Sequence, residues 1–235
     1  MIAQPFKTIV LDLLQQGHLD EEAFLQGLSE AERNANGTWK LWSAKNHTAH
    51  KIFWHQHLIE KLTAIVQHRE LSQSEEDEEK LNWMTFEKHK LRPWSEVYAE
   101  SEQVYAELIT LVEQLSEEDL TTSRRFSAIS GDYPLYTAFL CNCYEHDHEH
   151  LAYYYKDRHN FPYAIHIREQ CADRIMQAEV PAWLKGSFLY NLACFYTELN
   201  RLEKAATLLQ EAVILVPAFN ERSKSDPELA ALMKG

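Results

Sequence analysis

Residues 42–62 read WSAKNHTAHKIFWHQHLIEKL, a stretch that combines a helical apolar pattern with four histidines. Its apolar residues recur every three or four positions, which is the spacing of one face of an α-helix, and the pattern continues to about residue 68. Trp42 and Ser43 open the segment, so the sequence predicts one long helix from this point. The apolar positions are Ala49, Ile52, Phe53, Leu58, Ile59, Leu62, Ile65 and Val66.

Three further segments have the same period. Residues 94–116 and residues 136–154 each form a long amphipathic pattern. Residues 5–30 are also predicted to be helical. We expect this segment to break near Gly17, with Asp20 as the cap of its second piece.

Polar connections separate these four segments. NANGT at residues 34–38 is typical of a turn, and the acidic run SEEDEEK at residues 74–80 is either a solvated connection or the start of a helix. No segment has the strict alternation of a β-strand. The chain is therefore predicted to be all-α, with an antiparallel four-helix bundle over residues 1–158.

A different pattern follows the tract DRHNFP at residues 157–162, which marks the predicted boundary. Residues 159–235 are expected to form a small helical extension, in which residues 186–219 have the spacing of one tetratricopeptide-like repeat and a short capping helix follows. We favour a packing appendage, and a docking groove for a partner is the alternative. Close helix packing is expected at Ala193, Ala205 and Ala212, with Leu192, Tyr196 and Leu209 in the seam.

The charge balance limits the classes of partner. Lys and Arg number 23 against 36 Asp and Glu, which gives a net charge of −13. We therefore expect no nucleic-acid partner and no anionic membrane surface, because both are bound by clustered cations. We also expect no membrane span and no secretory signal. We interpret the four cysteines as buried free thiols, which are typical of a reducing compartment, and therefore predict a cytoplasmic protein.

Residues 141–151 read CNCYEHDHEHL and contain three histidines. His146 and His150 would lie one turn apart on the helix face that continues the apolar stripe, whereas His148 projects to the opposite side. A polar ring buried without a partner costs about 1–3 kcal/mol, and a divalent metal bound by the ring nitrogens would offset that cost. The alternative is a pair of core-edge imidazoles, each hydrogen-bonded to a neighbour or to water.

A third ligand would come from the helix that begins at Trp42. Periodicity gives only a weak preference between His50 and His57 in this helix. Three carboxylates lie beside the other two candidate ligands, and we interpret them as exposed residues rather than as a general base. They are Glu145, Asp147 and Glu149.

Several short motifs point to a family. Trp42-Ser43-Ala44-Lys45, followed by His50 and the aromatic-rich Lys51-Ile52-Phe53-Trp54, resembles the second-helix signature of the DinB-like (YfiT-like) superfamily. The pair His146-x-x-x-His150 is similar to the second ligand segment of that family. Trp94 and the stretch 116–120 are similar to its third-helix region.

The resemblance implies a four-helix bundle with a three-histidine metal site. Its ligands would be His50, His146 and His150, and its metal would be nickel, zinc or iron. The resemblance also implies a metal-dependent transferase or hydrolase that acts on a small molecule or a low-molecular-weight thiol, in a bundle that can pair into a homodimer. The alternative is a non-catalytic scaffold in which the tetratricopeptide-like unit docks a partner, and bound metal is the property that separates the two.

Overall fold

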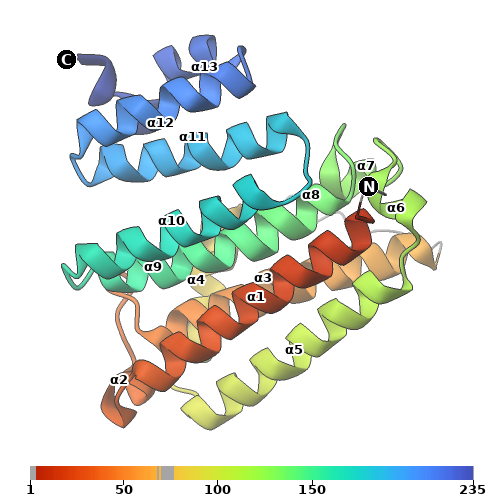
Figure 1. Cartoon of the computed structure of the whole chain (residues 1–235). Helices are drawn as coiled ribbons and strands as arrows, with labels where there is room; N and C mark the ends of the chain where they lie inside the picture. Colours follow the sequence, from red (N-terminus) through yellow and green to blue (C-terminus); the bar gives the residue numbers. More distant parts are fainter. Residues whose placement is uncertain (1–3, 68, 70–76, 235) are drawn as a thin grey trace. The chain divides into compact units, whose positions relative to one another are not determined.

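The computed structural model describes residues 4–67, 69 and 77–234 (Figure 1). Throughout those ranges the regular structure is helical, apart from one isolated bridge between Thr38 and Leu41, so the all-α prediction is confirmed. None of the helices in these ranges is both long enough and apolar enough to cross a membrane. The chain divides into two compact units, residues 1–164 and residues 165–235.

Long helical segments build the first unit. They are α1 (Phe6–Gly27), α3 (Ala44–Val66), α5 (Trp94–Gln114) and a continuous run of α8 (Tyr136–Phe139), η1 (Leu140–Glu145) and α9 (His146–Lys156). Shorter helices lie in the connections between them. These are α2 (Glu30–Asn34), α4 (Glu78–His89), α6 (Glu117–Thr121) and α7 (Ser127–Ser130).

The long segments of this unit share an apolar core. Helix α1 packs against α5 and against the α8–η1–α9 run, while α3 packs against α5, η1 and α9. Each segment contributes completely buried side chains, because its apolar residues lie on one face. Examples are Val10, Leu62, Val97, Val112, Phe139 and Leu140. This packing brings α3 and α9, which both carry histidines, into contact.

Helix α1 is continuous through Gly17, so the expected break at this glycine is wrong. A Cβ atom at Gly17 would lie 3.2 Å from Cδ2 of Tyr144 and 3.3 Å from Cε1 of His148. The missing side chain therefore lets α1 approach η1 and α9 closely. Asp20 does not cap a second helix; its carboxylate lies 3.0 Å from Nε2 of His148.

Helix α4 is a helix that the apolar pattern did not reveal. The Asp77 side chain caps it by accepting a hydrogen bond from the Glu79 N–H group at 3.0 Å. The acidic run thus starts a helix at residues 77–80, while residues 74–76 lie outside the described ranges. Trp83 and Met84 are exposed, so α4 buries only a narrow side against α3 and its sequence lacks a broad apolar stripe.

A capping box fixes the start of α3. The Ser43 Oγ atom accepts a hydrogen bond from the Asn46 N–H group at 3.2 Å, and Asn46 Oδ1 accepts one from the Ser43 N–H group at 3.0 Å. Gly37 lies against this box with a φ angle of +62°. A Cβ atom there would lie 2.6 Å from the Ser43 backbone nitrogen.

We expect Gly37→Ala to lower the free energy of unfolding by about 2–4 kcal/mol. A left-handed backbone is unfavourable for alanine, and the added methyl group would clash with both halves of the capping box, the Asn46 Oδ1 atom and, at 2.6 Å, the Ser43 backbone nitrogen. Denaturant unfolding measures the effect. Gly27→Ala is the control, because nothing lies within 4 Å of a Cβ atom there; an equal loss in both variants would contradict the role given to Gly37.

The second unit contains most of α10 (Phe161–Gln177), then α11 (Ala182–Glu198), α12 (Leu202–Leu215) and α13 (Phe219–Ser225). Two short 3-10 turns follow, η2 (Pro227–Leu229) and η3 (Leu232–Lys234). Helices α11 and α12 lie side by side (Figure 1). The residues expected at their contact are all buried. The alanines let the two backbones approach, and the larger side chains fill the seam. These contact residues are Ala193, Ala205, Ala212, Leu192, Tyr196 and Leu209.

All four cysteines are free thiols, as expected. Cys143, Cys171 and Cys194 are buried. Cys141 is only half-buried, so the expectation of burial is wrong for this residue.

Candidate metal centre

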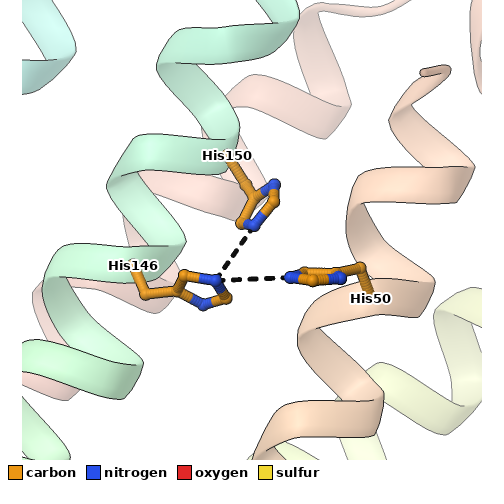
Figure 2. Close-up of side chains that lie close together, drawn as sticks. All are labelled: His50, His146 and His150. Carbon is orange, nitrogen blue, oxygen red and sulfur yellow. Dashed lines mark hydrogen bonds between the residues drawn. The ribbon is translucent and has the colours of Figure 1, made fainter. Parts of the chain in front are cut away.

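Three histidines from two helices meet inside the first unit. His50 comes from α3, and His146 and His150 come from α9 (Figure 2). The Nε2 atom of His146 lies 3.3 Å from Nε2 of His50 and 3.1 Å from Nε2 of His150. One ring nitrogen from each residue lies within 4.8 Å of the other two. The three predicted ligands therefore lie together and could hold a metal ion.

A wide helical turn directly precedes the two histidines of α9. Leu140–Glu145 form a π-helix, and the His146 N–H group donates to the Cys141 carbonyl oxygen, five residues earlier. Such turns accommodate one extra residue and are frequent at functional sites. Beyond this turn, His146 and His150 are separated by one α-helical turn, so both rings lie on the side of α9 that faces α3.

The three rings are uncharged at neutral pH. Burial lowers the pKa of His50 to about 3 and that of His146 to about 4, and it lowers the pKa of His150 well below the ordinary value. Repulsion between neighbouring histidines adds to the effect at His50 and His150. A neutral imidazole keeps one nitrogen lone pair, which is the form that binds metal.

The Nε2 atom of His146 has two close nitrogen neighbours but can form only one regular hydrogen bond. A ring nitrogen has either one N–H group or one lone pair, so this Nε2 atom cannot form regular hydrogen bonds with both His50 and His150. In addition, Nδ1 of His50 and Nδ1 of His146 are buried without a hydrogen-bond partner among the described residues. A cation shared by three Nε2 lone pairs would resolve the conflict at the centre of the cluster.

The spacing of the nitrogens fits such a cation. Metal–nitrogen bonds of about 2.0–2.1 Å in a tetrahedral site place neighbouring ligand nitrogens about 3.3–3.4 Å apart. The two Nε2–Nε2 distances of 3.3 and 3.1 Å are close to this value. A set of imidazole nitrogens suits zinc, copper, iron and nickel, whereas magnesium and calcium prefer oxygen. The residues present therefore fit a transition metal.

An aromatic ring and a fourth histidine surround the cluster. The Trp42 ring lies nearly parallel to that of His150, at 10° and a centroid distance of 6.0 Å, and meets the His50 ring edge-on at 5.2 Å. Nδ1 of His47, one turn before His50 on α3, lies 2.9 Å from Nδ1 of His150. Neither contact was predicted from the sequence, although His47 lies three residues before His50.

Two ion pairs, each with a buried cationic side chain and a partly buried carboxylate, lie beside the histidines. The Lys51 ammonium group contacts the Glu21 carboxylate of α1, and Nε2 of His55 lies 3.1 Å from Oδ1 of Asp147. Burial alone would lower the pKa of His55, but the Asp147 carboxylate and the Cys143 thiol raise it well above its usual value. The same pairing, with help from Lys51, holds the pKa of Asp147 at about 2 against the opposing effect of burial. The His55–Asp147 pair is therefore charged at neutral pH.

The expectation that the carboxylates beside His146 and His150 are exposed is wrong. Glu145 is buried, and Asp147 and Glu149 are half-buried. The reason is that α9 contacts both α1 and α3, so two sides of this helix are covered rather than one.

The structure brings His50, and not His57, beside the two histidines of α9. His50 lies in the cluster, while His57 is half-buried and stacks with Phe53 at 13° and 6.1 Å. His148 points away from the cluster, as expected, and lies between the Tyr144 carbonyl oxygen at 2.6 Å and the Asp20 carboxylate at 3.0 Å. The opposite face of α9 is thus also buried, against α1.

A second group of potential ligands lies nearer the surface. His18 and Glu22 of α1 meet Glu102 of α5, with His18 Nε2 at 3.9 Å from the Glu22 carboxylate and 3.5 Å from that of Glu102. The His18 ring also stacks on Tyr105 at 3.8 Å. These contacts account for the group without a metal ion, and its partly exposed carboxylates remain accessible to water.

Comparisons of the chain with family models, with curated proteins and with solved structures gave no match.

Proposed function

We propose that the protein is a metal-dependent enzyme of the DinB-like class, with a divalent nickel, zinc or iron ion held by His50, His146 and His150. The observation that carries the proposal is the convergence of three neutral imidazoles from α3 and α9, with Nε2–Nε2 distances of 3.1 and 3.3 Å. In this proposal, α1, α3, α5 and the α8–η1–α9 run are the four helices of the antiparallel bundle. The pairwise packing of these segments supports that assignment.

Three protein ligands leave at least one coordination position open. A bound ion with an open position acts as a Lewis acid and lowers the pKa of a water or thiol that reaches it. The proposed reaction is therefore group transfer or hydrolysis on a small molecule, with a low-molecular-weight thiol as a substrate or cosubstrate. The net charge of −13 favours a small molecule over a nucleic acid.

The surrounding residues have separate tasks in this proposal. Trp42 covers one side of the His50 and His150 rings and limits their contact with water. The Lys51–Glu21 and His55–Asp147 pairs match each charge beside the rings with an opposite one, while burial keeps the rings neutral and able to bind metal. No side chain is assigned as a general base.

We further propose that α11 and α12 form the tetratricopeptide-like hairpin and that it is a packing appendage rather than a docking groove. The buried alanines at the contact of the two helices support close antiparallel packing. A single unit offers little concave surface for a partner. The four free thiols support a reducing, cytoplasmic location.

Metal analysis tests the proposed function. The protein, purified without a polyhistidine tag, is expected to contain or take up about one transition-metal ion per chain. At a free-metal concentration 100 times the dissociation constant, binding should raise the free energy of unfolding by about 2.7 kcal/mol. Elemental analysis and denaturant unfolding with and without metal measure both quantities. No uptake after incubation with nickel, zinc or ferrous iron would overturn the proposal and favour the scaffold alternative.

A further inference from the structure

His47 contacts one histidine of the metal cluster without being one of the three proposed ligands. It lies one helical turn before His50 on α3, and its Nδ1 atom is 2.9 Å from Nδ1 of His150. Both rings are buried, and the angle between them is 56°. The contact uses the nitrogen of His150 that faces away from His146.

A contact between two neutral ring nitrogens needs one proton and one lone pair, so it can exist in two forms. In one form His47 donates, and the only proton of the neutral His150 ring then lies on Nε2. In the other form His150 donates through Nδ1, and its Nε2 atom has a free lone pair. Only the second form allows His150 to bind a metal ion through the nitrogen that lies 3.1 Å from His146 Nε2.

We infer that His47 is a positioning residue for the metal-bound form: its Nδ1 atom accepts a hydrogen bond from Nδ1 of His150, which directs the Nε2 lone pair of His150 toward His50 and His146. The inference rests on the proposed metal site. It assigns His47 the Nε2–H tautomer, with its Nδ1 lone pair toward α9. Nε2 of His47 is buried without a hydrogen-bond partner among the described residues, so the bound metal, which needs the Nε2 lone pair of His150, is what favours this form. Metal binding and the proton position on His47 are therefore coupled.

His150 differs from the other two proposed ligands because its Nδ1 atom has a hydrogen-bond partner. Nδ1 of His50 and Nδ1 of His146 have no hydrogen-bond partner within the described part of the chain. The orientation of His150 is thus fixed by a directed hydrogen bond, whereas the other two rings are held by packing, including the Trp42 contact with His50. Removal of a hydrogen-bond partner of this kind typically weakens metal binding 10- to 100-fold.

Two substitutions of His47 separate the hydrogen bond from the bulk of the ring. His47→Leu removes the acceptor. His47→Asn keeps one, because Oδ1 of asparagine is attached to Cγ as Nδ1 of histidine is. We expect His47→Leu to raise the zinc dissociation constant about 10- to 100-fold at an unchanged stoichiometry of one ion per chain, and His47→Asn to restore most of the affinity. His57→Leu, on the same helix but outside the cluster, should bind zinc as the wild type does.

The measurements are zinc competition titration and ¹H–¹⁵N NMR of the histidine side chains in the zinc-loaded protein. The spectrum of the wild type should show the His150 proton on Nδ1 and the His47 proton on Nε2, a signature that does not depend on whether any variant folds. Unchanged zinc affinity in a folded His47→Leu variant, or a His47 proton on Nδ1, would overturn the inference and leave the metal site intact. A wild type that binds no metal would instead overturn the proposed function, so the two failures are distinguishable.

Discussion

Alanine at position 150 is expected to reduce bound metal from about one ion per chain to background and to weaken zinc or nickel binding by more than about 100-fold. Loss of a hydrogen-bond partner of a ligand already costs 10- to 100-fold in affinity, so loss of the ligand itself should cost more. His150→Ala leaves only His50 and His146, two nitrogens whose Nε2 atoms lie 3.3 Å apart. Elemental analysis of the untagged protein and competition titration measure the loss.

His57→Ala is the matched control for this prediction, because it also removes one imidazole but from a residue outside the cluster. It should retain the full metal content. A His150→Ala variant that binds metal as tightly as the wild type would contradict the assigned site, and equal losses in both variants would indicate binding through exposed histidines in general.

The second large effect is expected at the buried pair between Lys51 and Glu21. Only 3% of the Lys51 surface is exposed, and its ammonium group contacts the Glu21 carboxylate of α1. Glu21→Gln removes the negative charge and leaves the ammonium group without its counter-ion in the interior. We expect a loss of about 3–5 kcal/mol in the free energy of unfolding, measured by denaturant unfolding.

Two further variants show whether the loss comes from an isolated charge. Glu21→Leu combined with Lys51→Met replaces both charges by apolar groups and should recover most of the stability. Glu87→Gln breaks the exposed Lys90–Glu87 pair and should cost less than about 1 kcal/mol. If Glu21→Gln costs no more than Glu87→Gln, the Lys51 charge is solvated rather than buried.

The long helices could be predicted from the sequence because each has a broad apolar face in the core, which places apolar residues three or four positions apart. Helix α4 could not be predicted in the same way, since it covers only a narrow strip of α3 and leaves Trp83 and Met84 exposed. The predicted break of the first helix at Gly17 is wrong for a different reason. Glycine weakens a helix locally, but here it permits close contact with Tyr144 and His148, and that contact depends on a segment more than 120 residues away.

The candidate site was partly predictable. His146 and His150 could be paired from sequence because four residues make about one turn of a helix. His50 and His57 could not be separated, because seven residues make almost two full turns and both rings share a face. The two residues differ in position by about 10 Å along the axis of α3. Only the packing of α9 on α3 decides which of the two rings lies beside His146 and His150. The contacts of His47 with His150 and of His55 with Asp147 depend on the same packing.

The wide turn at Leu140–Glu145 determines where the next two histidines lie. If the turn relaxed to ordinary α-helical pairing with its sequence unchanged, the following helix would rotate by about 100°, the angle of one residue. His146 and His150 would swing away from His50 together. Removal of one residue within the turn would absorb that rotation and keep both imidazoles in place. The pairing of this turn therefore sets the positions of His146 and His150 together rather than one at a time.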